Sequence, residues 1–359
     1  MPALRNDLAP FLLHEDPLVR DSVGFHFFET WPANEELAPL VLEACRRYGE
    51  EVTLNLLSFG CRFPLSAHGF LEAIRVLATS RPPFVEQWVS MAPLSLVKSR
   101  ADLTRSVLSS RALSRLERRT SLLRQSTSEL WRRLEGHARK LDDRVAERGD
   151  WDETEDLLET LSRVSRRDEI AAKIGALEDV ESPHLRWALL DLAGVMKLHE
   201  RAEGIVDRLE DDEGTARAAS QALARIGSPL LAAAIGDRYR ERSKSFRRFA
   251  ISVLKAVKLD ASEALLRRLV EVETDPALRG RIFDGLRFHF TFESEALLER
   301  ELEASTSWMV PEEIQKALYV FACLRGASEP ELEGWRSLLA SMGELDIYFH
   351  IPFNESPGR

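Results

Sequence analysis

The chain repeats itself every 31 residues over about positions 180–290, and this repeat constrains its fold more than any other feature. One column of the repeat is arginine, and the columns two, six and nine residues later are apolar. In order, the four columns hold Arg186, Arg217, Arg248 and Arg279; Ala188, Ala219 and Ala250; Leu192, Leu223 and Leu254; and Val195, Ile226, Val257 and Phe288. The apolar columns are offset by four and then three residues, which places them on one stripe of an α-helix. The repeat therefore predicts one amphipathic helix in each unit.

A second apolar column predicts a second helix in each unit. It holds Ile205, Ile235, Leu266 and Leu297, at intervals of 30, 31 and 31 residues. Turn residues separate the helices: a Gly-Ser-Pro turn occupies 227–229, and Asp275-Pro276 opens a helix with proline in its first turn. Neither helix can bury its apolar stripe alone, so we expect the hairpins to stack and share a continuous core, as in a solenoid.

These residues resemble a known repeat family. Residues 275–279 (Asp-Pro-Ala-Leu-Arg) and 16–20 (Asp-Pro-Leu-Val-Arg) look like the D-P-x-V-R opening of HEAT-like repeats of the PBS-lyase type. The stretch 213–227 resembles the helix of that family that ends in A-L-x-x-I-G. The resemblance covers residues 180–290 best. It implies an all-α fold, an armadillo-like, right-handed α-solenoid of helical hairpins, and it implies little about activity because such folds carry many functions.

Composition divides the chain into four segments. Residues 1–97 predict short helices interrupted by prolines, and we expect degenerate helical hairpins that cap the solenoid. Residues 98–150 predict one or two long basic amphipathic helices, because positions 98–144 hold 13 basic and six acidic residues, a local net charge of +7. Residues 151–342 form the predicted HEAT-like repeat solenoid, and 343–359 form an aromatic tail.

The tail fits no helix pattern. Its apolar candidates for partner binding are Ile347, Tyr348, Phe349 and Phe353. We expect the tail to fold back as a carboxy-terminal cap, because the ends of a solenoid need covering. The alternative is a docking peptide that adds to a partner protein. Deletion of residues 344–359 distinguishes the two, because loss of solubility favours the cap and intact folding with a lost partner favours docking.

The predicted second helices carry a candidate partner-binding stripe. Its members are Arg208, Arg238, Tyr239, Arg242, Arg267 and Arg268. Second helices line the concave face in the resembling family, and concave faces are where solenoids usually bind. The alternative is a solvated face, because 41 of the 49 basic residues are arginine. For the arginine column of the first helices we expect a ladder of ion pairs with acids such as Glu181, Glu213 and Asp275, rather than a ligand site.

Charge and motifs narrow the function classes. The 49 basic and 59 acidic residues give a net charge of −10, which disfavours nucleic-acid coating and anionic membranes. The acidic stretch 152–156 falls at a predicted helix start, where acids complement the helix dipole. The chain has no phosphate-cradling glycine motif and no nucleophile elbow. Three cysteines make no disulfide framework, and neither a membrane span nor a signal peptide is recognisable, so we expect a cytoplasmic protein.

Two His-Glu pairs raise the question of a metal. HEAT-like deoxyhypusine hydroxylases bind iron through repeated His-Glu pairs at matched positions, but His14-Glu15 and His199-Glu200 occupy different positions in their units. We therefore expect no metal and no other cofactor.

These observations favour a non-enzymatic adaptor or scaffold that binds another protein through the solenoid groove or the carboxy-terminal tail. The alternative is a nucleic-acid-binding or DNA-repair protein similar to the HEAT-like alkylpurine DNA glycosylases, which use basic concave grooves with Trp and Asp. A third hypothesis is a lyase or hydroxylase like other HEAT-like enzymes.

Overall fold

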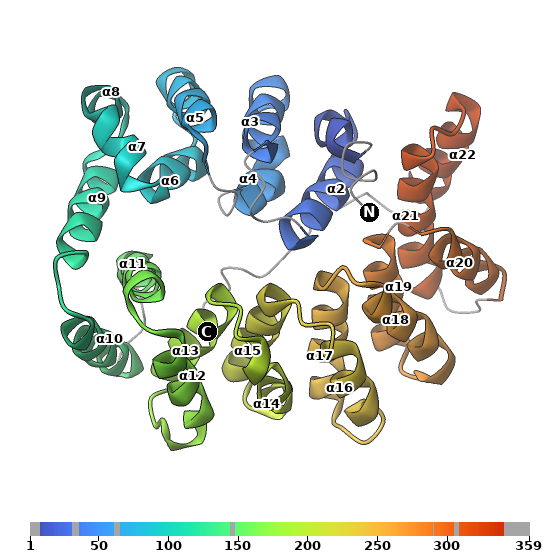
Figure 1. Cartoon of the computed structure of the whole chain (residues 1–359). Coiled ribbons are helices and arrows are strands. Elements are labelled where there is room, and N and C mark those ends of the chain that lie inside the picture. The colour runs from blue at the N-terminus through green and yellow to red at the C-terminus, as the bar shows by residue number, and fades with distance from the viewer. Residues whose placement is uncertain are drawn as a thin grey trace.

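The protein is all-helical in the part of the chain that the structure describes. The computed structural model describes residues 8–30, 36–60, 65–143, 148–289, 291–304 and 309–340. Within these ranges every regular element is a helix, and no strand occurs. Figure 1 shows the helices following one another around a ring, with hairpins standing side by side. The all-α prediction is confirmed.

The amino-terminal half consists of short helices. They are η1 (Ala9–Leu13), α2 (Pro17–Thr30), α3 (Leu37–Tyr48), η2 (Glu51–Thr53), α4 (Leu54–Gly60), α5 (Ala67–Thr79), α6 (Pro83–Met91), α7 (Leu94–Ser99), α8 (Ala101–Val107), α9 (Ser110–Leu122) and α10 (Thr127–Asp142). Where the sequence predicts one or two long helices in the basic segment, the structure has α8, α9 and α10, the last two of 13 and 16 residues. Ser109 caps α9 by accepting from the Ala112 N–H, and Ser126 forms a capping box with Glu129 that starts α10.

The carboxy-terminal half contains the repeat. Its elements are α11 (Arg148–Val164), α12 (Arg167–Gly175), η3 (Leu177–Asp179), α13 (Pro183–Val195), η4 (His199–Arg201), α14 (Ala202–Val206), η5 (Asp207–Glu210), α15 (Glu213–Ile226), α16 (Leu231–Arg238), α17 (Lys244–Ala256), α18 (Asp260–Val272), α19 (Pro276–Arg287), α20 (Phe292–Ala304), α21 (Met309–Leu324) and α22 (Glu329–Ala340). The first helices of the units are α13, α15, α17 and α19, and each packs against the next. Leu192, Leu223 and Leu254 take equivalent places in them and are fully buried, as the repeat predicts.

The Asp-Pro-x-x-Arg motif has the same structural role at its two occurrences. Asp275 accepts hydrogen bonds from the N–H groups of Ala277 and Leu278, and Pro276 takes the first helical position of α19. Arg279 reaches back and donates to the carbonyl oxygens of Val270 and Glu273, at the end of α18. These carbonyls have no partner within α18 itself, so the arginine closes one helix while the aspartate opens the next.

Arg20 makes the corresponding contact at the amino-terminal motif. Its guanidinium donates to the carbonyl oxygens of His14 and Glu15 at 2.7 and 2.8 Å. The side chain is fully buried and lies over the Tyr48 ring. Both arginines of the motif therefore donate hydrogen bonds to backbone carbonyl groups in the turn that precedes their own helix.

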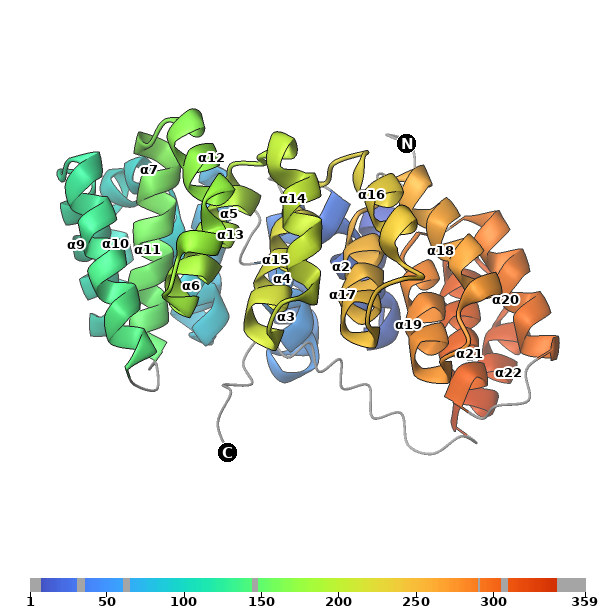
Figure 2. The same cartoon turned by 90° about the horizontal axis from the view of Figure 1, so that it is seen from below.

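The two ends of the described chain meet. Helix α2 contacts α17 and α21, and Figures 1 and 2 show it beside the carboxy-terminal helices. A small apolar cluster joins Leu18 and Val19 to Tyr319, Val320 and Cys323. The helices of residues 8–30 therefore cover part of the carboxy-terminal repeats.

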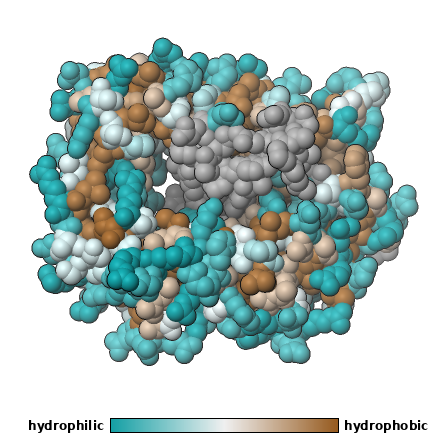
Figure 3. Space-filling view, viewed as in Figure 1, coloured by the Kyte–Doolittle hydropathy of each residue, from teal (hydrophilic) through white to brown (hydrophobic). Residues whose placement is uncertain are grey.

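The apolar core is divided rather than continuous. One cluster of buried residues runs from Leu122 to Phe321, and a second runs from Leu8 to Leu116. Around the outer edge of the ring hydrophilic residues predominate, and hydrophobic ones form separate patches (Figure 3). Within the described ranges, no helix combines the length and the apolar character needed to cross a lipid bilayer.

Candidate functional site

The arginines of α9, in the basic segment, pair with the acidic helix α11 that follows it. Arg115 of α9 pairs with Asp156 at 3.0 Å, with Asp152 at 3.2 Å and with Glu155 at 2.8 Å. Arg118 pairs with the same Asp156 at 2.7 Å. The acids of residues 152–156 thus serve as ion-pair partners of α9 and α10. They lie past the first turn of α11, which begins at Arg148, so the expectation that they fall at a helix start is wrong. The arginine charges of α9 are therefore compensated inside the fold, whereas most other basic side chains of the segment are exposed.

The arginines of the predicted partner-binding stripe also form ion pairs with acidic side chains. The stripe lies on the outer side of the ring, not on the concave side that the resemblance implies. Arg238 contacts Asp207 at 3.2 Å, and Arg242 contacts the same carboxylate at 3.0 Å. Arg208 pairs with Glu178 of the preceding unit. Helices α14, α16 and α18 lie on the outer side of the ring in Figure 1, whereas the resemblance implied that second helices line a concave face. These arginines link successive hairpins on the outside.

The remaining candidates differ in accessibility. Tyr239 is buried, and its hydroxyl donates to Glu273 at 2.8 Å, so it is not part of a binding surface. Arg267 is half-buried, 3.9 Å from Glu263, while Arg268 is exposed. The tail candidates Ile347, Tyr348, Phe349 and Phe353 lie outside the described residues.

The arginine column of the first helices forms the expected ladder at three of its four positions. Glu213 accepts from Arg217 of its own helix at 3.2 Å and also pairs with Arg248 of the next unit. Arg279 pairs with Glu301 at 2.7 Å. Arg186 differs, because it makes no hydrogen bond or ion pair within the described part of the chain, and its Nε is buried without a partner.

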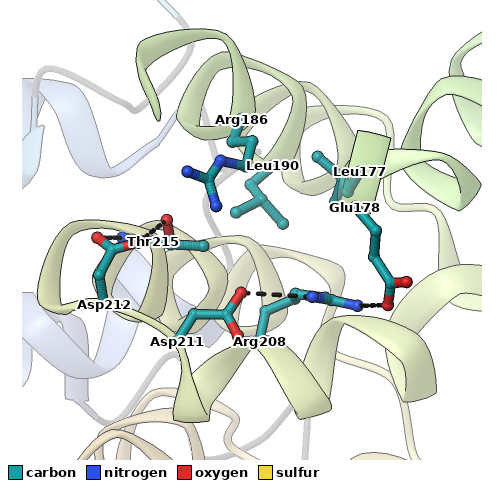
Figure 4. Close-up of a pocket in the computed structure, with 8 residues that line it drawn as sticks. All are labelled: Leu177, Glu178, Arg186, Leu190, Arg208, Asp211, Asp212 and Thr215. Carbon is teal, nitrogen blue, oxygen red and sulfur yellow. Dashed lines mark hydrogen bonds and ion pairs between the residues drawn. The ribbon is translucent and has the colours of Figure 1, made fainter. Parts of the chain in front are cut away.

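Arg186 lies in the wall of a pocket between α13 and α15. The pocket measures about 340 Å³, and Figure 4 shows the Arg186 guanidinium directed into it. Its lining residues are Leu177, Glu178, Arg186, Leu190, Arg208, Asp211, Asp212 and Thr215. They come from η3, α13, η5 and the start of α15, so the pocket lies at the junction of two hairpins.

The acids of the pocket already have partners. Arg208 holds Glu178 and makes a 3.5 Å hydrogen bond to Asp211. Asp212 caps α15 and accepts from the Thr215 hydroxyl at 2.7 Å. Burial alone would raise the pKa of Asp212, but the hydrogen bonds from Thr215 and the charge of Arg186 hold it below its usual value. The guanidinium of Arg186 is thus the polar group of the pocket that lacks a direct partner.

A row of three rings includes two from α13, the helix of Arg186, and one from α11. The His184 ring is 4.6 Å from the Trp187 ring and 6.0 Å from Trp151 of α11, between centroids. Asp142 fixes the imidazole through a 2.6 Å contact between Oδ1 and Nδ1. Trp187 packs on Gly214 so closely that a Cβ there would collide with its ring. Trp151 is 42% exposed, so one end of the row is open to solvent.

Sequence reasoning did not find this row or the pocket. The three rings come from α11 and α13, and the pocket from four elements, so no single spacing in the sequence marks either. The His-Glu pairs are far apart in the chain, with His14 at the end of η1 and His199 at the start of η4. Within the described residues, no group of three or more His, Cys, Asp and Glu side chains could hold a metal ion.

Comparison with known proteins adds no family assignment. No protein family model matches the chain, and no curated protein matches it.

Proposed function

We propose that this protein is a non-enzymatic adaptor, built as a right-handed α-solenoid of HEAT-like hairpins, that binds another protein at the α13–α15 junction. The observation that carries the proposal is the guanidinium of Arg186, which is directed into a pocket and has no direct partner in the described chain. The HEAT-like assignment is supported by the shared geometry of the two Asp-Pro-x-x-Arg motifs and by the stacking of α13, α15, α17 and α19.

The residue types at this junction suit a protein partner. Tryptophan and arginine dominate the binding energy of protein interfaces, especially where they cluster near partly buried pockets. Arg186 lines the pocket, and Trp187 packs on Gly214 at the start of α15. Trp151 lies on the neighbouring helix α11, 6.0 Å from His184 of α13 between ring centroids. Because these helices are packed into the array, they would present the side chains in a fixed arrangement and lose little entropy on binding.

The proposal is tested by affinity purification from the native host with tagged wild type and Arg186→Glu. We expect a protein that co-elutes with the wild type and is lost with the variant. Arg281→Glu makes the same charge change at an exposed position of α19 and should retain the partner. An identical set of co-eluting proteins for all three chains contradicts binding at this junction, and in that case deletion of residues 344–359 tests the tail as the binding element.

A second candidate function is nucleic-acid binding. Trp151 favours it, because an exposed ring beside the paired His184 and Asp142 could stack on a base. The neutralisation of α9 by α11 weighs against it, because phosphate contacts need available cations. A duplex gel shift that weakens steeply as salt rises would favour this function over the adaptor.

A further inference from the structure

The four arginines of the repeat column allow an internal comparison. Three of them form ion pairs with a carboxylate: Arg217 and Arg248 with Glu213, and Arg279 with Glu301. At the fourth position no described carboxylate lies within ion-pair distance, although Asp212 is near enough for the charge of Arg186 to lower its pKa. The fold therefore repeats an arginine–carboxylate contact and omits the carboxylate at one position, where it leaves a pocket instead.

A partly buried guanidinium without a direct partner is unfavourable, because desolvation of the charge is not offset by hydrogen bonds. Arg186 is half-buried, its Nε atom is buried without a partner, and unlike Arg248, whose Nε is also unpartnered, it makes no ion pair within the described residues. A carboxylate that enters the pocket would make charge-assisted hydrogen bonds of the kind that Arg279 makes with Glu301. The pocket volume of about 340 Å³ is enough for one side chain of a partner.

We infer that the pocket between α13 and α15 receives a glutamate or aspartate side chain from an acidic segment of the partner, with Arg186 as its counter-charge. This inference rests on the proposed adaptor function and specifies the chemistry of the partner. Leu177 and Leu190 would contact the methylene groups of the entering side chain, since both line the pocket.

The acids of the pocket do not exclude such a segment. Glu178 is held by Arg208, and Asp212 is held by the first turn of α15. Asp211 has one side-chain hydrogen bond within the described residues, at 3.5 Å from Arg208. A peptide supplies backbone N–H donors as well as its carboxylate, so the same segment would donate to Asp211 while it accepts from Arg186.

The test uses the full chain and two capped tripeptides as probes, Ac-Glu-Glu-Glu-NH2 and Ac-Gln-Gln-Gln-NH2. The peptides are titrated while the arginine Nε–H signals are followed by NMR. We expect the glutamate peptide to shift the Arg186 signal and to bind about tenfold more tightly than the glutamine peptide, the effect of one charge-assisted contact. Arg186→Gln should abolish this preference, and Arg281→Gln should retain it.

Equal affinity for the two peptides, or a preference that survives in Arg186→Gln, overturns the inference. Thermal melts of each variant check folding, and Arg186→Lys, which keeps the charge, should retain part of the preference. The peptide result and the co-purification result separate the two proposals. A glutamate preference without any co-purifying protein supports the pocket chemistry and contradicts the adaptor function. A co-purifying protein without a glutamate preference supports the adaptor function and contradicts the pocket chemistry.

Discussion

The Tyr319 hydroxyl donates a hydrogen bond to the Asp16 carboxylate at 2.5 Å, and the two residues are 303 positions apart in the chain. Asp16 also caps α2 through the Leu18 N–H, at 2.8 Å. Burial and the bond to Asp16 both raise the pKa of the Tyr319 hydroxyl, which keeps it a donor. Together with the apolar contacts of Val19 and Val320, this bond joins the amino-terminal helix to the last repeats.

Tyr319→Phe should weaken this junction. It removes a hydrogen bond to a charged acceptor, for which we expect a loss of about 2 kcal/mol in the free energy of unfolding. Hydrogen exchange should also become faster in α2, because the helix loses a contact with α21. The control is Tyr239→Phe, which removes a hydrogen bond within the repeats and should leave exchange in α2 unchanged. Equal exchange in α2 for wild type and Tyr319→Phe contradicts a stabilising role for this bond.

Arg115→Ala should destabilise the protein strongly. Asp156 is fully buried and pairs with Arg115 and Arg118, so the variant leaves a buried carboxylate that has lost one of its two cations. Breaking a buried pair typically costs about 3–5 kcal/mol, measured here by chemical denaturation. Arg166→Ala removes an exposed pair with Asp168 and should cost less than about 1 kcal/mol. Similar losses of unfolding free energy in the two variants would show that the ion pairs between α9 and α11 do not stabilise the fold.

Arg279→Ala should cost more stability than Arg217→Ala, although both arginines belong to one column. Arg279 serves two carbonyl oxygens at the end of α18 as well as Glu301, and unsatisfied polar groups there cost about 1–3 kcal/mol. Arg217 makes a half-exposed pair with Glu213, for which we expect a loss within about 1 kcal/mol. Denaturant midpoints of the two variants measure the difference, and a larger loss for Arg217→Ala would contradict the helix-closing role.

Asp21→Asn should change how stability depends on pH. Burial raises the pKa of Asp21 from 3.8 to about 6, so the folded protein binds a proton there that the unfolded chain releases between these values. This group favours the fold at acidic pH and opposes it as the pH rises through 6. The variant should therefore be more stable than wild type at pH 7 to 8, by up to about 3 kcal/mol.

The buried histidines act in the opposite direction. Burial lowers the pKa of His26 from 6.5 to about 4 and lowers that of His289 as well. Both take up protons on unfolding, so their contribution is present above pH 6.5 and is lost as the pH falls below it. Without Asp21 to offset them, stability should fall more steeply between pH 6.5 and 4. Parallel stability curves for wild type and Asp21→Asn in denaturation at several pH values would refute this assignment.

The sequence predicted the hairpins well because each helix carries its own apolar stripe. Leu192, Leu223 and Leu254 fall on equivalent buried positions, since a 31-residue period keeps every unit in the same register. The basic segment divides into more helices than its apolar spacing predicts. Ser126 and Glu129 form a capping box, a local signal that outweighs the uninterrupted apolar spacing.

The arrangement of the hairpins was not predictable in the same way. Both helices of a hairpin have an apolar stripe, so the side that faces inward depends on small packing rotations that no single residue encodes. The contact between Asp16 and Tyr319 depends on the sum of these rotations along the chain. The pocket depends on a missing carboxylate opposite Arg186, and the sequence contains acids such as Glu181 and Asp212 close enough to suggest a pair.

The central claim is that the helical hairpins stack in chain order until the two ends meet. Double electron–electron resonance between spin labels at Glu15 and Glu329 tests it most directly, because both positions are exposed and lie near the junction. The labels require a chain whose three native cysteines are replaced by alanine, checked for unchanged helix content. We predict a single, narrow distribution at short distance. A broad distribution at long distance would contradict the closed arrangement.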